Sequence, residues 1–212
     1  MTCEHCCGAD QFFDLKSARK ELKSYKKNGP RKSTKALLSL LSGFDQKGKS
    51  LLDIGGGIGA IQWEFVKNGG IKTTDVDSSS GYLSVASDYA LEINHKNASF
   101  KMSDFNDVHE ELAKHDFVSL DKVVCCYPDY EKLLGNALKK TGAVLAMTLP
   151  IGGWVSKLLG HLAKIYLIIK NNPFRTYIHS PEKVQEFIES NGFRLTEKSL
   201  SFPWLVRVYE RC

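Results

Sequence analysis

A run of glycines stands where an apolar, strand-like segment gives way to a helical one. Residues 50–54 predict a short strand, and Gly55, Gly57 and Gly59 follow it directly. Glycine lets the backbone approach a ligand closely, and a helix N-terminus favours negative charge. The spacing from Gly55 through Gly57 to Ala60 also fits the dinucleotide fingerprint. We therefore predict a cofactor-binding turn; the alternative is an ordinary strand-to-helix turn.

Three carboxylates follow or end three predicted strands. Asp53 lies two residues before the glycines, where it would repel a pyrophosphate but suit an ammonium or a sulfonium. Asp77 lies about twenty residues further on, where an acid can bind ribose hydroxyls. Asp104 follows a third strand and is placed to meet an adenine amino group. Each could instead cap a helix, but together they predict a ligand crevice at the carboxyl ends of parallel strands.

Alternating strands and helices position these groups. The apolar pattern predicts five strands, over 50–54, 71–77, 98–102, 120–126 and 142–148. Helices are predicted between them, from the glycines to Asn68 and over 79–93, 108–114 and 130–140. This alternation indicates a doubly wound, Rossmann-like α/β sheet with right-handed crossovers.

The C-terminal part follows another pattern. A helix is predicted over 181–190, and strands over 193–200 and 205–211. The gap between these two strands is too short for a helical crossover, so if they pair, they must be antiparallel. We therefore expect seven strands with an antiparallel last strand.

Composition limits the function classes. The chain has 212 residues, of which 42% are hydrophobic, which fits one globular domain and excludes a disordered chain. No apolar run reaches the length of a transmembrane helix, and the first residues do not resemble a secretory signal. We therefore expect a cytoplasmic protein.

The net charge of +5 comes from one segment. Residues 16–35 carry nine Lys and Arg against Glu21, whereas the part after residue 35 has no net charge. Apolar residues recur at helical spacing over 11–27, and a second helix is expected after Ser33 and Thr34. The basic segment thus predicts a solvated helix face, with attraction for an anionic substrate or lipid surface as an alternative.

Three stretches carry a family resemblance. Residues 51–59 (Leu-Leu-Asp-Ile-Gly-Gly-Gly-Ile-Gly) resemble the first motif of class I S-adenosylmethionine-dependent methyltransferases, and 76–79 and 102–105 resemble their ribose-binding and adenine-contacting motifs. The resemblance implies an N-terminal helical lid in residues 1–45, a methyltransferase domain over 46–212, and S-adenosylmethionine as cofactor. The implied cofactor-binding residues are Asp53, Gly55, Gly57, Gly59, Asp77, Ser79, Asp104, Phe105 and Cys125.

Two further stretches resemble the magnesium-protoporphyrin O-methyltransferase branch. They are residues 120–128 and 175–179, and Cys126 stands where that branch has histidine. The chain resembles more closely an uncharacterised bacterial group with the same Cys-rich start.

The acceptor is predicted to be a small or medium-sized, apolar molecule, with O-methylation favoured. A hydroxyl acceptor gains from a general base, for which His179 is our candidate, with Tyr127 and Tyr177 orienting the acceptor. Each could instead be a packing residue. The hydrophobic insertion over 151–172 could pack on the sheet, cover an apolar substrate or contact a membrane surface.

Cysteines gather at two places. Cys3, His5, Cys6 and Cys7 could supply zinc ligands, although a reactive, disordered terminus is the alternative. Cys125 and Cys126 are expected as core thiols of a central strand, with a redox or metal role as the alternative.

The sequence favours three other functions less. An RNA methyltransferase would use the basic 16–35 segment against phosphates, but the Asn-Pro-Pro-Tyr-type loop that such enzymes use is absent after the fourth predicted strand. A non-catalytic binding module with an N-terminal metal site is disfavoured by the glycine loop and the three acids. A Rossmann dehydrogenase is disfavoured by Asp53 and the terminal hairpin.

Overall fold

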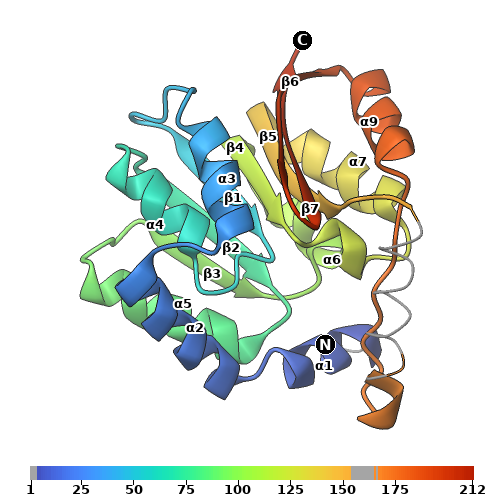
Figure 1. Ribbon diagram of the computed structural model, residues 1–212. Helices are drawn as coiled ribbons and strands as arrows, with labels where there is room; N and C mark the ends of the chain where they lie inside the picture. Colours follow the sequence, from blue (N-terminus) through green and yellow to red (C-terminus); the bar gives the residue numbers. More distant parts are fainter. Residues whose placement is uncertain (1–3, 154–164, 166) are drawn as a thin grey trace.

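The computed structural model describes residues 4–153, 165 and 167–212, which fold around a seven-stranded sheet of order β3-β2-β1-β4-β5-β7-β6 (Figure 1). Strands β1 to β5 run parallel, and β7 is antiparallel to both of its neighbours. The predicted α/β fold with a reversed last strand is confirmed. The strands are β1 Ser50–Ile54, β2 Lys72–Asp77, β3 Ala98–Met102, β4 His115–Asp121, β5 Thr141–Pro150, β6 Phe193–Ser201 and β7 Trp204–Arg211.

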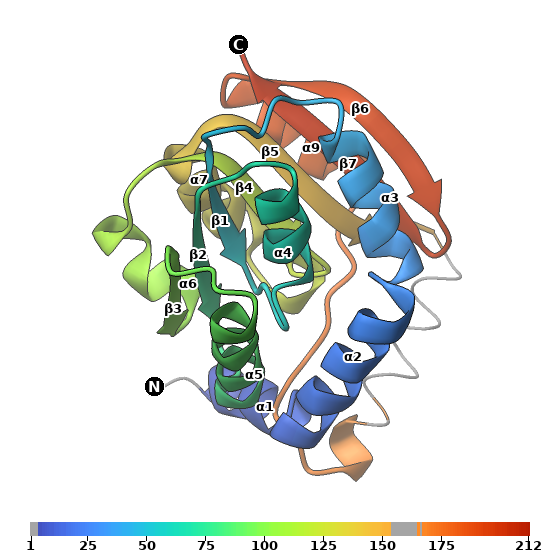
Figure 2. The same ribbon diagram turned by 90° about the vertical axis from the view of Figure 1, so that its left-hand side faces the viewer.

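Helices cover both faces of the sheet (Figures 1 and 2). Helices α3, α4 and α5 lie on one face, and α6, α7 and α9 on the other. Successive residues of β1 serve the two layers, since Leu51 packs in the cluster with α3 and α4 and Leu52 in the cluster with α7 and α9. The helices are α1 Glu4–Phe12, α2 Leu15–Asn28, α3 Lys32–Leu41, α4 Ala60–Lys67, α5 Ser80–Glu92, α6 Phe105–Val108, α7 Tyr130–Lys140 and α9 Pro181–Ser190, with single 3-10 turns η1 His109–Glu111 and η2 Val124–Cys126.

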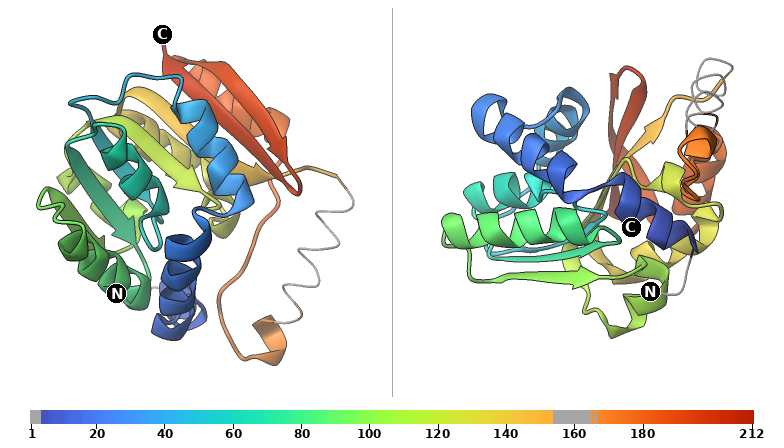
Figure 3. Two further views of the ribbon diagram at one scale, coloured as in Figure 1. Left: turned by 60° about the vertical axis from the view of Figure 1, so that its left-hand side comes forward. Right: turned by 90° about the horizontal axis from the view of Figure 1, so that it is seen from below.

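The N-terminal helical pattern divides into two helices. Asp14 caps α2, because its carboxylate accepts from the backbone N–H of Ser17 at 2.8 Å, and Gly29 ends α2 with φ 75°. The predicted helix over 11–27 therefore begins at Leu15, and α1 precedes it. From below, α1 lies at the end of the sheet where β1 and β2 finish (Figure 3, right).

The predicted position of the fourth strand is wrong. β4 occupies 115–121, where Phe117, Val118 and Ser119 pair with β1 and β5. The more apolar residues 124–126 form η2 instead, so the interpretation of Cys125 and Cys126 as thiols of a central strand is wrong as well. Pairing on both sides outweighs the local strand preference of the Val-Val-Cys-Cys run. The helix predicted over 108–114 is likewise displaced, to 105–111.

More than half of the hydrophobic insertion predicted over 151–172 lies outside the described residues. Near its end, Leu167 is buried, while Ile168 and Ile169 are exposed. Within the described ranges, no helix combines the length and the apolar character that crossing a membrane requires.

Candidate functional site

A cavity of about 830 Å³ opens at the carboxyl ends of the parallel strands. Such strand ends form the ligand crevice of doubly wound sheets. The glycine loop and the strand-end acids line one side of the cavity, and residues of α1, of α2 and of the segment 170–174 line the other. The predicted cofactor-binding residues in its lining are Asp53, Gly55, Gly57, Asp77 and Asp104.

The glycine loop needs glycine for two physical reasons. Gly55 and Gly57 have φ of 64° and 60°, in the left-handed region. A Cβ on Gly55 would lie 2.6 Å from Cγ2 of Val123, and one on Gly59 would lie 2.4 Å from the Trp63 ring. Gly59 itself is the N-cap of α4 and lies outside the cavity lining. At Gly55, Gly56 and Gly57 the loop therefore presents backbone to the cavity, with Ile58 as its one side chain in the lining.

Asp53 is a buried acid with one unused oxygen. The Ser119 hydroxyl donates to its Oδ1 at 2.6 Å, whereas Oδ2 has no hydrogen-bond partner among the described residues. Burial raises the pKa of Asp53 to about 7, and repulsion from Asp121 and Asp77 adds to the shift. Its free oxygen would accept a hydrogen bond from a cationic ligand.

A second buried acid, Asp75, lies beside Asp53 in register on β2. Its Oδ1 accepts from the Gly56 N–H at 3.2 Å, and its Oδ2 from the Gln62 amide at 2.7 Å. Burial raises the pKa of Asp75 well above its usual value, and Asp53 adds to the effect. Sequence reasoning missed this residue, although an acid in the middle of a central strand was a signal.

Asp77 holds the loop from the end of β2. Its carboxylate accepts from the backbone N–H groups of Gly57 at 3.0 Å and Ser79 at 2.8 Å. Burial nevertheless raises its pKa. Ser79 does not line the cavity; it caps α5 and donates to the Phe13 carbonyl at 2.6 Å, which ties α5 to the segment between α1 and α2.

Asp104 lies at the cavity, as predicted, and it also caps a helix, which was the alternative role. It lines the cavity and also caps α6 by accepting from the Asn106 N–H at 2.8 Å. The Tyr127 hydroxyl donates to it at 3.1 Å, and Tyr127 also lines the cavity. Phe105, by contrast, is a core residue outside the lining.

The turn after β4 differs from the prediction in which cysteine meets the cavity. Cys126 lines it, whereas Cys125 is only 8% exposed and does not. Cys125 accepts at its carbonyl from the Tyr177 N–H at 2.7 Å.

His179 and Tyr177 lie behind that turn and not in the cavity lining. The Nε2 of His179 is 2.8 Å from the Tyr127 carbonyl, a contact in which the ring nitrogen must donate. The His179 ring packs on Tyr130 with centroids 4.9 Å apart. These contacts support the turn that carries Tyr127.

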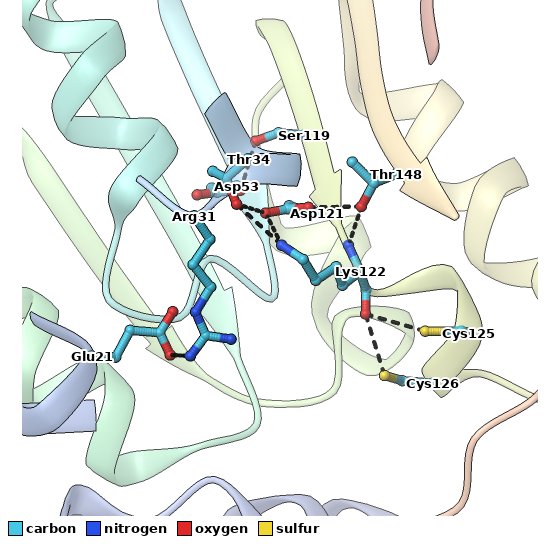
Figure 4. Close-up of polar contacts among 10 residues, drawn as sticks. All are labelled: Glu21, Arg31, Thr34, Asp53, Ser119, Asp121, Lys122, Cys125, Cys126 and Thr148. Atoms are coloured by element: carbon cyan, nitrogen blue, oxygen red, sulfur yellow. Dashed lines mark hydrogen bonds and ion pairs between the residues drawn. The ribbon is translucent and has the colours of Figure 1, made fainter. Parts of the chain in front are cut away.

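Sequence reasoning also missed a polar cluster, because it displaced β4. Asp121 accepts from the Thr34 hydroxyl at 2.5 Å, the Lys122 ammonium at 2.7 Å and the Thr148 hydroxyl at 2.7 Å (Figure 4). Thr34, Asp121 and Lys122 all line the cavity, as does Arg31, which pairs with Glu21 at 2.8 Å. This cluster joins α3 to the ends of β4 and β5.

Three aromatic side chains contribute to the apolar part of the cavity wall, on the side of α1 and the segment 170–174. Phe12 stacks on Phe174 with centroids 5.7 Å apart, and Phe13 meets Phe174 edge to face at 5.5 Å. All three line the cavity. The strand ends are acidic, so the cavity joins a charged side to an aromatic one.

The predicted metal ligands are only partly described. Cys3 precedes the described residues, and α1 begins at Glu4, with Cys7 exposed. Within the described ranges, no group of three or more His, Cys, Asp or Glu residues is placed to hold a metal ion. A zinc site in the N-terminal segment stays a prediction.

Comparison with known proteins gives one family. A family model described as a methyltransferase domain matches residues 25–198. A ubiquinone biosynthesis O-methyltransferase from Coxiella burnetii is 26% identical over 157 residues. That match covers 71% of this chain and 66% of the relative, slightly less than two thirds of its length.

Solved structures share the fold at low sequence identity. Magnesium protoporphyrin IX methyltransferase from Synechocystis, with bound SAH, has a TM-score of 0.69 at 15% identity, covering 85% of this chain and 82% of that one. An O-methyltransferase family protein from Burkholderia thailandensis has a TM-score of 0.69 at 11% identity, covering 94% and 63%.

Proposed function

This chain belongs to the methyltransferase-domain family of S-adenosylmethionine-dependent enzymes, and from that membership we propose that it methylates an oxygen of a small, apolar acceptor. The observation that carries the proposal is the two-sided cavity. Its acidic, glycine-lined side suits the cationic cofactor, and its side formed by Phe12, Phe13 and Phe174 suits an apolar acceptor.

The residues present fit S-adenosylmethionine. The unpartnered Oδ2 of Asp53 can accept from the ammonium of the cofactor, and the bare backbone of Gly55 and Gly57 leaves room beside it. Asp77 would bind the ribose hydroxyls, and Asp104 the adenine amino group. Four predicted residues would not touch the cofactor but would hold the elements that do. They support the glycine loop, the helix starts and the turn after β4, and are Gly59, Ser79, Phe105 and Cys125.

When bound, the cofactor supplies an electrophilic methyl group on a sulfonium. The chain contributes mainly orientation and exclusion of water. The aromatic wall would hold the acceptor against the cofactor side, and the α1 and α2 residues in the lining would close the cavity as the lid predicted for residues 1–45. A role of the insertion over 151–172 in covering an apolar substrate stays a prediction.

We propose positioning roles for His179 and Tyr177. The contact from His179 to the Tyr127 carbonyl and the one from Tyr177 to the Cys125 carbonyl fix the turn that brings Tyr127 to the cavity. Tyr127 is then the candidate that would touch the acceptor or the cofactor. A general-base role for His179 stays a prediction, as do contact with a membrane surface and a cytoplasmic location.

O-methylation is supported by what the relatives are named for, since two of them are O-methyltransferases. An RNA substrate is less favoured, because part of the basic segment is paired within the protein, as in Lys26 with Glu92 and Arg31 with Glu21.

Calorimetry with S-adenosylmethionine, S-adenosylhomocysteine and NAD tests the cofactor assignment. We expect binding of the first two and none of NAD, with a loss of at least about tenfold for Asp77→Ala, because the ribose contact disappears. Release of S-adenosylhomocysteine in the presence of hydroxylated aromatic compounds then tests the acceptor class. Binding of NAD in preference to S-adenosylmethionine would refute the proposal.

A further inference from the structure

Two neighbouring thiols converge on one backbone oxygen in the turn after β4. The Sγ of Cys125 lies 3.4 Å from the Lys122 carbonyl oxygen, and the Sγ of Cys126 lies 3.5 Å from the same atom (Figure 4). Adjacent residues of an extended strand would point to opposite faces, whereas the 3-10 turn puts both sulfurs on one side.

The turn is fixed by several hydrogen bonds. The Cys126 N–H donates to the Val123 carbonyl at 2.7 Å, and the Lys122 N–H donates to the Thr148 hydroxyl at 2.8 Å. The Tyr177 N–H donates to the Cys125 carbonyl at 2.7 Å from the far side. The thiol pair is therefore held in place before any ligand arrives, which lowers the entropic cost of binding.

One thiol of the pair borders the cavity, and the other lies buried beside it. The neighbouring thiol lowers the pKa of Cys125 and raises that of Cys126, so the thiolate forms more easily on Cys125. Cys126 lines the cavity, so a small molecule in the cavity reaches the pair through Cys126.

The geometry of adjacent cysteines limits which bonds and ligands the two thiols can share. A direct disulfide would be strained, since neighbouring Cα atoms lie about 3.8 Å apart and disulfides usually span about 4.4 Å or more. Zinc prefers four ligands, and among the residues that the structure describes no three-ligand group exists. A pyramidal, trivalent arsenic atom can be bound by only two sulfurs that lie on the same side. Because the arsenic atom lies between the two sulfurs, the bridge is longer than a disulfide and avoids its strain.

We propose that Cys125 and Cys126 form a two-thiol binding site for a trivalent arsenical within the cavity. In the binding step, the As=O group of an arsine oxide meets both thiols. Two As–S bonds form, the As=O bond breaks, and the oxygen leaves as water with both thiol protons, so no atom changes oxidation state. The inference rests on the turn alone and goes beyond the proposed methyl transfer.

Phenylarsine oxide and intact-mass spectrometry test this site. The parent protein is the full chain with Cys3→Ser, Cys6→Ser, Cys7→Ser and Cys212→Ser, so that only the pair remains. We expect one phenylarsenic adduct per chain, which survives an excess of the monothiol 2-mercaptoethanol and is removed by the dithiol dimercaptopropanol, because one arsenic atom joined to two thiols resists exchange with monothiols.

The controls change one sulfur at a time. Adding Cys125→Ser or Cys126→Ser to the parent should abolish the monothiol-resistant adduct, and Cys125→Ala replaces Cys125→Ser if the latter unfolds. Thermal shift by S-adenosylhomocysteine, recorded on each protein, reports separately on the cofactor site. A parent that forms no adduct, a monothiol-labile adduct, or a resistant adduct that persists after Cys126→Ser would each overturn the proposal.

Discussion

At the scale of single residues, the two buried carboxylates Asp53 and Asp75 set the electrostatics of the cofactor side. A Cβ on Gly56 would lie 2.8 Å from Oδ2 of Asp53 and 2.7 Å from Oδ2 of Asp75, so both oxygens lie beneath the same residue. Two buried acids so close together cannot both ionise cheaply. Because the pKa of Asp75 is raised well above normal and that of Asp53 is raised to about 7, we expect Asp53 to be the acid that ionises near neutrality.

This arrangement predicts pH-dependent cofactor binding. The ammonium group of S-adenosylhomocysteine stabilises the charged form of Asp53, so affinity for this ligand should rise as the pH increases from about 6 to about 7, by about fivefold. Calorimetry at several pH values measures the change. Asp53→Asn should bind more weakly and lose this dependence, whereas an affinity of the wild-type protein that stays constant over this range would contradict the prediction.

The same pair predicts a stability effect. Since the pKa of Asp75 is higher in the folded chain than its ordinary 3.8, its contribution to stability is fully present below that value and is lost as the pH rises toward the folded value. Asp75→Asn removes this loss. The new amide can still accept from Gly56, and it can donate to Oε1 of Gln62, which has no partner among the described residues, after Gln62 flips.

We therefore expect Asp75→Asn to melt a few degrees above wild type at about pH 8, with a difference that shrinks toward about pH 4. Calorimetric or fluorescence melting curves across that range measure it. Equal melting temperatures at high pH would show that Asp75 carries no raised pKa.

At the scale of elements, the glycine loop links fold and binding. Gly57 has φ 60° and lines the cavity, and Gly29 has φ 75° at the end of α2 with no heavy atom within 4 Å of a Cβ built on it. An alanine at Gly57 meets left-handed strain of about 1–2 kcal/mol. An alanine at Gly29 is strained at least as much, because its ψ of −169° lies in a region that is essentially restricted to glycine. The two positions differ in whether the added methyl group faces the cofactor side.

Gly57→Ala should therefore weaken S-adenosylhomocysteine binding by more than about tenfold, while Gly29→Ala leaves it unchanged. Urea unfolding is expected to show that Gly29→Ala loses at least as much stability as Gly57→Ala, so weaker binding by Gly57→Ala alone would not be an effect of stability. If both variants bind alike, the loop does not approach the cofactor as proposed.

At the scale of elements, the bounds of several strands and helices could be predicted from the sequence. Strands β1, β3 and β7 and helices α7 and α9 lie within a residue of their predicted bounds, because each has a clear period and a clear stop. β4 was displaced because its own sequence contains His115, Asp116 and Ser119, which a local pattern scores as polar. Two of these side chains form hydrogen bonds with residues that only the folded sheet brings near. His115 contacts Thr74 at 2.9 Å, and Ser119 donates to Asp53.

The wrong position of β4 also affects the prediction of the candidate site. A strand over 120–126 puts Asp121 inside the strand, so its contacts with Thr34 and Lys122 do not follow from the sequence. The acids that end β2 or follow β3, by contrast, were found from spacing alone, because their strands were placed correctly.

At the scale of the whole molecule, the cavity is closed by segments far apart in the chain. Gly8 in α1 lies against Phe174, and the Asn172 amide donates to the Gly8 carbonyl at 3.0 Å. Asp10 fastens α1 on the other side, since it accepts from both the N–H and the hydroxyl of Ser80 at 2.7 and 2.8 Å. Opening the cavity by moving α1 must break these contacts.

Asp10→Ala should loosen α1 without unfolding the sheet. We expect faster hydrogen exchange in residues 4–12 and faster release of S-adenosylhomocysteine, by several-fold. Asp129→Ala, which removes the cap of α7 away from the lid, is the matched control and should change neither. Unchanged exchange in Asp10→Ala would argue against a mobile lid.

The place of β7 in the sheet bears on how the protein is made. β7 follows every other strand in the chain, yet it lies between β5 and β6 and pairs with both. During synthesis, one edge of β5 therefore stays unpaired, and β6 has no strand partner, until the residues of β7 leave the ribosome. The nascent chain is then most exposed to edge-to-edge association. Prolonged stalling before Trp204 would leave the cofactor side assembled on β1 to β4 while the rest of the sheet still lacked the strand that joins it.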